Sequence, residues 1–331
     1  MKQEFEAMED PKGLWKYIPV KLLPSLKDAQ KAVPAIAKDA KLLAAIEEGV
    51  KSVPTHHRMV CQDATKRWKS VAPESVHLVV TSPPYWTLKE YRREEGQLGF
   101  VEDYGLFHKE LDKVWRQAYK SLVPGGRLVV NVGDVCLSRR KNCGRHTVVP
   151  LHATIQEHCR NIGFDNLAPI IWYKISNAVY EAKGNGSGFL GKPYEPGAVI
   201  KNDIEFILMF RKPGGYRSPS LPERIASVIS GENHKKWFQQ IWTGLTGAST
   251  RHHPAPYPAE LAERLIRMFT FVGDTVLDPF SGTASTSVGA ARWGRNSIGI
   301  ELDPEYFEMG LNRLTKETRG LFSSATIEAE K

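Results

Sequence analysis

The sequence has few of the features that mark membrane or secreted proteins. Its 331 residues contain only four cysteines, which are too few to build a disulfide framework in a chain of this length. No apolar run approaches the roughly 18–20 residues of a membrane-spanning helix, and the N-terminal stretch is too polar and acidic for a secretory signal. We therefore expect a reduced, cytoplasmic, globular protein without a membrane partner.

Signatures of metal sites and of repeat architectures are missing as well. The sequence has no CxxC or HExxH pair, so no metal site is expected. It also has no internal repeat and no low-complexity tract. Hydrophobic residues make up 41% and charged residues 25%, which is the composition of an ordinary globular domain with a sizeable core.

Acidic residues are scarce in one region only. The formal net charge is +8, but residues 121–240 alone contain 16 Lys and Arg against 9 Asp and Glu. Residues 241–331 are slightly acidic, with 9 basic and 11 acidic side chains. A positive excess confined to one region favours a surface that faces a polyanion such as nucleic acid.

Hydrophobic periodicity predicts the fold class. From about residue 56, short apolar strands alternate with amphipathic helices, which favours an open, doubly wound α/β sheet with helices on both faces. The expected strands are 59–61, 76–81, 127–132, 167–173, 204–210, 275–277 and 297–300. The expected helices include 104–122, 148–161, 258–271, 284–293 and 304–316. Earlier residues are expected to form a helical extension interrupted by prolines.

The segment Thr81–Trp86, with the sequence TSPPYW, directly follows the apolar run 76–80. In a doubly wound sheet, ligands bind beyond the carboxyl ends of the strands, which is where this segment lies. Its two prolines remove backbone donors and leave the Ser82 hydroxyl and the Pro83 carbonyl as acceptors beside the ring of Tyr85. Such a site suits a flat substrate whose amino group donates two hydrogen bonds. The alternative is a rigid turn at a strand end.

A second segment, 275–286 (TVLDPFSGTAST), has the pattern of a ligand-binding loop. A strand ends at Asp278, and small residues then lead into a helix, so a ligand can approach the backbone there. The loop has only Gly282 where a dinucleotide-binding loop needs three glycines. About twenty residues later, the strand 297–300 ends at Glu301, whose carboxylate can accept both hydroxyls of a ribose. A nucleoside with a compact, non-diphosphate tail therefore fits better than a dinucleotide.

Together these segments resemble a known enzyme family. TSPPYW, followed in order by HPAPYPAEL, VLDPFSGTAS and IGIELDPEYF, is similar to the amino-group DNA methyltransferases that use S-adenosyl-L-methionine. The order is that of the permuted (beta) arrangement, in which the catalytic half comes first, and the resemblance covers about residues 56–316. It implies a mostly parallel, seven-stranded sheet of the Rossmann-like methyltransferase type. In this family, Ser at the first motif position is typical of enzymes that methylate N4 of cytosine.

The resemblance also implies roles for individual residues. The implied catalytic residues are Ser82, Pro83, Pro84 and Tyr85, with the tyrosine as the stacking surface for a flipped base. The implied cofactor-binding residues are Asp63, Asp278, Pro279, Phe280, Gly282 and Glu301. Asp278 would lie near the methionyl amine of the cofactor. The family's cofactor loop usually reads FxGxG, but here the second glycine is Ala284, whose methyl group is expected to crowd the methionine portion.

The same resemblance divides the chain into segments. We expect a helical extension at 1–55, a methyltransferase domain at 56–320 and a C-terminal tail at 321–331. The methyltransferase domain would consist of a catalytic half at 56–211 and a cofactor half at 251–320, with target-recognition insertions at about 176–202 and 212–250. Both insertions lie in or beside the positively charged region.

The expected partner is double-stranded DNA. Candidate DNA-binding residues are Arg139, Arg140, Lys141, Lys183, Lys192 and Arg217. A separately encoded restriction endonuclease and a second copy of the chain are further partners that the resemblance allows. Two alternatives stay open, namely methylation of N6 of adenine and a non-catalytic DNA-binding protein with the same fold. Carbon-5 methylation is disfavoured because it needs a nucleophilic cysteine, and Cys61 lies in a predicted strand.

Overall fold

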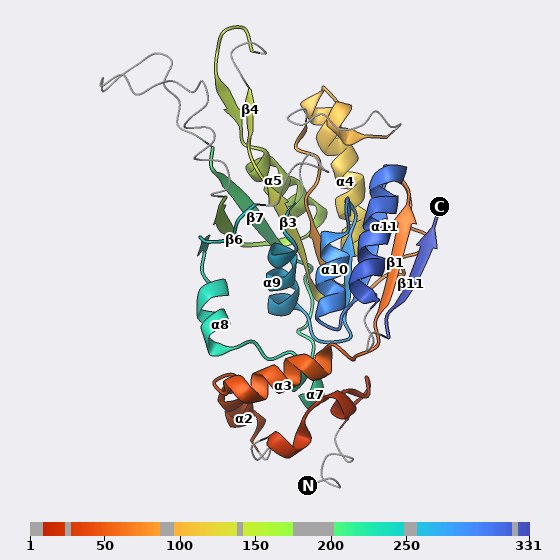
Figure 1. Ribbon diagram of the computed structural model, residues 1–331. Coiled ribbons are helices and arrows are strands. Elements are labelled where there is room, and N and C mark those ends of the chain that lie inside the picture. Colours follow the sequence, from red (N-terminus) through yellow and green to blue (C-terminus); the bar gives the residue numbers. More distant parts are fainter. Residues whose placement is uncertain are drawn as a thin grey trace, which may run out of the picture.

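A nine-stranded sheet forms the centre of the computed structural model, in the order β11-β1-β10-β9-β2-β3-β7-β6-β8 (Figure 1). The structure describes residues 9–23, 28–86, 96–137, 142–174, 202–247, 257–319 and 324–331. The strands of the sheet are β1 (His56–Cys61), β2 (Val76–Thr81), β3 (Leu122–Val132), β6 (Asp165–Tyr173), β7 (Ile204–Arg211), β8 (Ile241–Trp242), β9 (Thr275–Asp278), β10 (Asn296–Glu301) and β11 (Thr326–Glu330).

The predicted fold class is confirmed, and all seven expected strands are present. The six strands from β11 to β3 are mutually parallel, whereas β7 is antiparallel to both of its neighbours. The number of strands differs from the expected seven because β8 and β11 extend the two edges. β8 has only two residues and β11 has few apolar residues, so neither has a clear periodic signal in the sequence. The segment expected to be a C-terminal tail thus contributes a strand.

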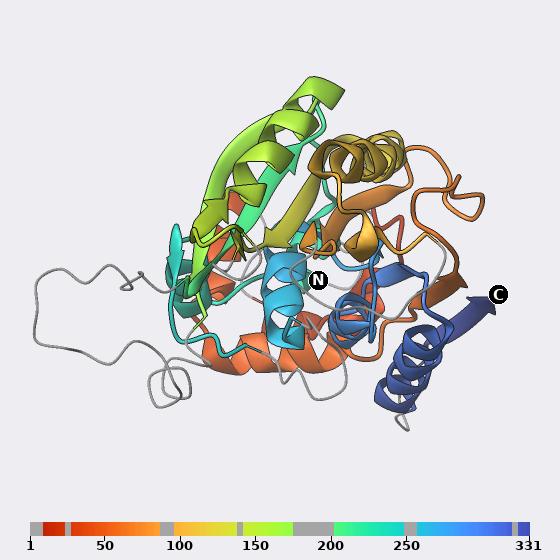
Figure 2. The ribbon, with the colours of Figure 1, turned by 90° about the horizontal axis from the view of Figure 1, so that it is seen from above.

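Helices cover both faces of the sheet (Figure 2). One face packs against α4 (Tyr104–Ser121) and α5 (Leu151–Ile162), and the other against α9 (Ala259–Phe269), α10 (Ser285–Arg292) and α11 (Pro304–Thr318). In β2, Leu78 and Val80 join the cluster under α9, while Val79 joins the cluster under α4. This alternation is the reason that the buried strands are apolar on both sides.

The N-terminal extension forms a separate small core at the amino ends of the parallel strands (Figure 1). It consists of two short 3-10 helices followed by α2 (Ala29–Ile36) and α3 (Ala40–Val50), and it packs against α7 (Leu221–Ala226). Asp28 and Asp39 cap the two α-helices by accepting backbone N–H bonds. The second predicted insertion, 212–250, therefore includes a helix that belongs to this amino-edge layer. The helix α8 (Gly231–Trp237) follows it.

A two-stranded hairpin of β4 (Val135–Leu137) and β5 (Thr147–Val149) projects past the opposite, carboxyl edge of the sheet (Figure 1). It begins directly after β3 and precedes α5. No helix in the described ranges is long and apolar enough to cross a membrane.

Asp274 connects the N-terminal extension to the sheet. Its side chain is fully buried, and its oxygens pair with Lys12 (2.9 Å) and with both terminal nitrogens of Arg217 (2.9 and 2.7 Å). Burial alone would raise the pKa of Asp274, but the bonds from Arg217 and the charges of His77 and Lys12 outweigh it and lower this pKa.

We predict that Asp274→Asn destabilises the protein by about 3 kcal/mol, because Lys12 and Arg217 would lose the one carboxylate that they share, and this carboxylate is fully buried. Urea unfolding at pH 7 measures this change. Asp165→Asn is the matched control, since its ion pair with Arg211 is 29% and 43% exposed and should contribute less than about 1 kcal/mol. Equal losses in the two variants would contradict the role given to Asp274.

Candidate functional site

A pocket lies at the carboxyl edge of the sheet, where β1, β2, β9 and β10 end. Because parallel strands end at the same edge, loops that are distant in sequence meet there. The lining residues are Asp63, Ala64, Ser82, Pro84, Gly96, Gln97, Leu98, Pro279, Phe280, Glu301, Leu302 and Tyr306. Six of the predicted site residues are therefore brought together, whereas Pro83, Tyr85, Asp278 and Gly282 do not line this pocket.

Glu301 ends β10 and is held by backbone donors from two loops. Its Oε2 accepts the N–H of Gly282 (2.7 Å) and its Oε1 accepts the N–H of Asp303 (2.9 Å). Burial raises the pKa of Glu301 to about 7, although both N–H groups act in the opposite direction. Gly282 has φ +49°, so it acts through its backbone rather than as a pocket wall.

Asp63 also lines the pocket, and it lies two residues after β1. Its Oδ1 accepts the N–H of Thr65 (2.8 Å). Gly96 approaches it closely, because a Cβ at this glycine would lie 2.8 Å from Asp63 Oδ2. Gly96 also has φ +89°, which a side chain rarely tolerates. The sequence motifs did not single out this glycine, and only the tertiary contact reveals its importance.

Asp278 does not line the pocket, although the resemblance implies a place near the methionyl amine of a cofactor. Its side chain is 1% exposed and accepts four hydrogen bonds. The donors are Thr81 Oγ1 (2.6 Å), Tyr257 OH (2.7 Å), Thr286 Oγ1 (2.7 Å) and the N–H of Phe280 (3.0 Å). Burial raises the pKa of Asp278, and these donors oppose the rise. Asp278 therefore holds the loop that carries Pro279 and Phe280 without lining the pocket itself.

Ala284 also differs from expectation. It has φ +61°, the left-handed conformation for which a glycine is favoured, and it precedes α10. Its methyl group is fully buried with Met59, Val288, Phe307 and Leu314, in the core between α10, α11 and β1. The methyl group therefore points into the protein, and the predicted crowding of the cofactor does not occur. The cost is a strained backbone of about 1 kcal/mol.

A chain of polar side chains links Ser82 to three residues that the motifs did not identify. Ser82 Oγ donates to the Tyr85 hydroxyl (3.2 Å), which also accepts a bond from Asn131 Nδ2 (3.2 Å). The same nitrogen donates to Glu205 Oε2 (2.7 Å), and Glu205 Oε1 pairs with Lys174 Nζ (2.7 Å). Because only the NH2 group of an amide can face a carboxylate, Glu205 fixes the orientation of Asn131.

The signal that marks these residues is their polarity within buried strands. Asn131 interrupts the apolar end of β3 and is 3% exposed, and Glu205 lies in β7 and is 8% exposed. Buried polar side chains usually require partners, but the sequence does not say which partners those are. β3 and β7 pair in the sheet, and this pairing brings the two residues into contact.

The predicted DNA-binding residues are only partly described. Arg139, Arg140, Lys141, Lys183 and Lys192 lie outside the described residues. Arg217 lies at the amino edge, where both of its terminal nitrogens bond to Asp274. It faces away from the pocket, and its role there is structural.

The donor set of the pocket fits an adenosine-containing ligand. The pocket is lined by the carboxylates of Glu301 and Asp63 and by the apolar side chains of Phe280 and Leu302. A carboxylate suits ribose hydroxyls, and an apolar wall suits a purine ring. Among the residues with a described placement, no group of three His, Cys, Asp or Glu could hold a metal ion.

Comparisons with known proteins identify the family. Residues 76–312 match a DNA methylase family of N6/N4 methyltransferases. The type II methyltransferase M.MjaI of Methanocaldococcus jannaschii is 39% identical over 284 residues, which are 76% of this chain and 88% of that protein.

Solved structures resemble this one. The putative DNA modification methylase TTHA0409 of Thermus thermophilus, crystallised with S-adenosyl-L-methionine, is 49% identical, covers 83% of this chain and 98% of its own, and has a TM-score of 0.68. The cytosine-N4-specific PvuII DNA methyltransferase has a TM-score of 0.56 and covers 83% of this chain and 96% of its own. At 20% identity, this second likeness shows the fold alone.

We predict that Glu301 makes the ligand-free protein less stable as pH rises. Its folded-state pKa of about 7 lies above the ordinary 4.5, so its proton stabilises the fold below pH 4.5. That contribution is lost as pH rises through 7, and it amounts to about 3 kcal/mol at most. Urea unfolding from pH 5 to pH 8 should show a steeper loss for the wild type than for Glu301→Gln.

The control for this prediction is Glu157→Gln, which changes an exposed carboxylate paired with Arg160. This variant should keep the pH slope of the wild type between pH 5 and pH 8. A Glu301→Gln profile parallel to that of the wild type would show that Glu301 is already ionised in the folded protein.

Proposed function

Because this chain belongs to the DNA methylase family of N6/N4 methyltransferases, we propose that it methylates N4 of cytosine in duplex DNA. The observation that carries the choice of base is the unaltered SPPY motif, whose Ser82 lies in the same pocket as Phe280 and Glu301. A duplex hides the N4 atom in its base pair, so the target cytosine would be flipped out of the helix.

S-adenosyl-L-methionine is the methyl donor, and its sulfonium supplies an electrophilic methyl group. Glu301 would accept the ribose hydroxyls, Phe280 and Pro279 would line the binding edge, and Asp63 would face the adenine. Gly282 supports this arrangement by donating its N–H to Glu301. Asp278 supports it indirectly, by holding the loop that carries Pro279 and Phe280.

The catalytic motif offers acceptors for the target amino group. Ser82 Oγ–H points at the oxygen of Tyr85, which leaves the lone pairs of Ser82 available to accept an N–H of the base. The Pro83 carbonyl would accept the second N–H, and Pro84 fixes the turn. Two such bonds draw the nitrogen lone pair out of ring conjugation. N4 would gain the methyl group and lose one of its two protons, which would pass to water through its hydrogen-bond acceptor. The reaction then depends on alignment more than on a strong base.

Tyr85 is proposed as the surface on which the base stacks. Without DNA its side chain is only 6% exposed, and a Cβ at Gly133 would lie 3.4 Å from the ring. Stacking therefore requires this part of the site to open when DNA binds. Trp86 is already engaged elsewhere, because its indole N–H bonds to the carbonyls of Val101 and Glu102.

The proposed DNA surface lies at the carboxyl edge. The β4–β5 hairpin projects there, and the residues that connect its strands include Arg139, Arg140 and Lys141. Lys183 and Lys192 belong to the proposed recognition segment 176–202, most of which lies outside the described residues. Within the second proposed insertion, 212–250, α7 does not belong to this surface, because it packs on the N-terminal extension at the other edge.

Two alternatives differ in their support. The matched family includes N6 as well as N4 methyltransferases, so adenine is the second candidate base. The non-catalytic reading rested on Ala284, and the burial of its methyl group in the core removes that support. Because M.MjaI is a type II methyltransferase, we also propose that this chain acts in restriction-modification together with a separately encoded endonuclease. We further propose that two copies of the chain form a homodimer.

Ser82→Ala should lower the methylation rate of duplex DNA by about 100-fold, because the amino group loses an acceptor in the transition state. Binding of S-adenosyl-L-methionine, measured by calorimetry, should stay within about twofold of the wild type. Ser75→Ala removes a comparable hydroxyl at an exposed turn and is the control. Full activity of Ser82→Ala would contradict the catalytic role proposed for Ser82.

The target base has its own test. Sequencing that detects modified bases in DNA from cells expressing the chain identifies the base and the methylated atom.

Glu205→Gln should lower kcat by about 10–100-fold with little change in cofactor affinity, since a neutral amide no longer fixes Asn131 and hence Tyr85. Single-turnover methylation at saturating cofactor gives this rate. Glu157→Gln, which changes an exposed pair with Arg160, is the control. A rate equal to that of the control would show that the polar chain does not position the motif.

A further inference from the structure

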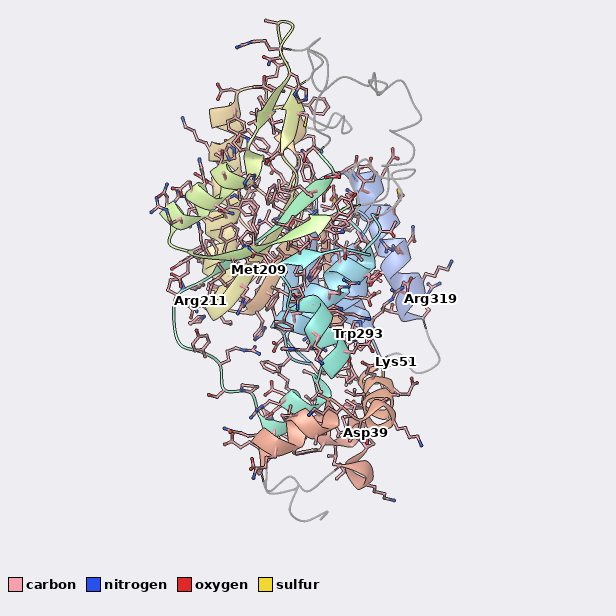
Figure 3. The ribbon with its side chains drawn as sticks, turned by 90° about the vertical axis from the view of Figure 1, so that its left-hand side faces the viewer. Asp39, Lys51, Met209, Arg211, Trp293 and Arg319 are labelled. Atoms are coloured by element: carbon pink, nitrogen blue, oxygen red, sulfur yellow. The ribbon has the colours of Figure 1, made fainter. Side chains whose placement is uncertain are left out.

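A second cavity lies at the amino edge of the sheet, at the opposite end of the strands from the pocket lined by Ser82 and Glu301, which we call the SPPY pocket. The N-terminal extension closes one side of it through Val33 and Pro34 of α2 and through Ala37, which directly follows this helix, and the end of α9 forms another side. Figure 3 shows β7 ending at Arg211 above the N-terminal helices, and the Cα of Arg211 pairs with that of Arg127 in the sheet.

The lining of this cavity is unusual in charge. It includes four arginines and two histidines but no carboxylate among the described residues, namely Arg127, Arg217, Arg224, Arg267, His77 and His234. The SPPY pocket, in contrast, is lined by two carboxylates and no arginine. A concave surface that is lined by positive charges and no negative charges concentrates anions.

Two of these arginines already pair with carboxylates that do not line the cavity. Arg217 makes a two-point contact with buried Asp274, and His77 Nε2 lies 3.7 Å from the same carboxylate. Arg267 Nη2 pairs with Glu47 (2.7 Å) and stacks on Trp293. These two arginines build the wall of the cavity and are not free to bind a ligand with all their donors.

Arg127 and Arg224 have no such partner. Within the part of the chain that the structure describes, neither makes an ion pair with a carboxylate. Arg127 is half-buried, its guanidinium lies 4.5 Å from the centroid of the Phe269 ring, and its neighbour across the sheet is Arg211. Burial and the charge of Arg211 lower the pKa of Arg127. A guanidinium stays charged even so, and partial burial without a counterion is unfavourable.

The surplus of charge can be counted. The cavity wall and the groups paired with it contain five cations and three carboxylates, which are Arg127, Arg217, Arg224, Arg267 and Lys12 against Asp274, Glu47 and Glu223. Two positive charges are left over, and they match a phosphate group with two negative charges. The planar fork of a guanidinium also fits two phosphate oxygens at once.

We propose that this cavity is a phosphate-binding site in which Arg127 and Arg224 hold the anion. The N-terminal extension then has a function besides covering the sheet, because it supplies one wall of the site. DNA held at the carboxyl edge for methylation lies at the other end of the sheet. A small phosphate compound is therefore the source that the geometry favours, and the test separates it from a nucleic acid.

The test is thermal unfolding and calorimetry of the full-length protein with inorganic phosphate and pyrophosphate, against sodium chloride of equal ionic strength. Wild type should bind pyrophosphate, and Arg127→Met and Arg224→Met should each weaken binding about tenfold or more. Arg116→Met is the matched control, because Arg116 is exposed on α4 and far from the cavity lining. Arg127→Lys keeps the charge without the fork and should bind with intermediate affinity.

Competition with a short duplex identifies the source of the phosphate. A duplex that leaves pyrophosphate binding unchanged assigns the site to a small compound, and one that displaces pyrophosphate from wild type assigns it to nucleic acid. The proposal is overturned if wild type shows no binding beyond the chloride control at millimolar concentrations. It is also overturned if Arg127→Met binds pyrophosphate as well as Arg116→Met does, provided that its unfolding curve shows a folded protein. If Arg127→Met does not fold, Arg127→Lys replaces it, and binding equal to that of Arg116→Met overturns the proposal.

Discussion

The carboxylate of Asp278 joins the two halves of the site. It accepts hydrogen bonds from Thr81 at the end of β2, from Tyr257 before α9 and from Thr286 in α10, as well as from the backbone of its own loop. Thr81 directly precedes the SPPY segment, so this segment and the loop that carries Pro279 and Phe280 share one buried anchor. Because the carboxylate is almost completely buried, each of these donors is needed to satisfy it. The relative position of the two loops follows from this anchor.

The candidate site and the ion pairs that attach the N-terminal extension lie at opposite ends of the strands. At the carboxyl edge, backbone donors and short acceptor side chains form a pocket with few cations, which suits a neutral amino group and a nucleoside. At the amino edge, ion pairs around Asp274 attach the N-terminal extension, and an arginine-lined cavity lies beside them. The positive charge of residues 121–240 is therefore not one continuous surface. Part of it, including Arg217, belongs to the amino edge.

Much of the fold could be predicted from the sequence, since seven strands and the covering helices have strong local periodicity. The apolar runs of β2 and β3 are buried on both faces, and their pattern does not depend on knowing the neighbour. β8 and β11 were missed because they are held by a single neighbouring strand, β6 and β1 respectively. The packing of α7 on the N-terminal extension was missed for a related reason, because it joins segments that are far apart in the chain.

The family resemblance and the pocket residues Asp63, Ser82, Phe280 and Glu301 could be predicted from the sequence, because short motifs at the ends of parallel strands meet at one edge. The contacts of their neighbours followed only from the folded structure. It turned Asp278 into a buried anchor, directed the methyl group of Ala284 into the core, and joined Asn131 to Glu205 across two strands. The physical reason is that the role of a polar side chain depends on its burial and on its partners. Those partners come from distant parts of the chain, which only folding brings together.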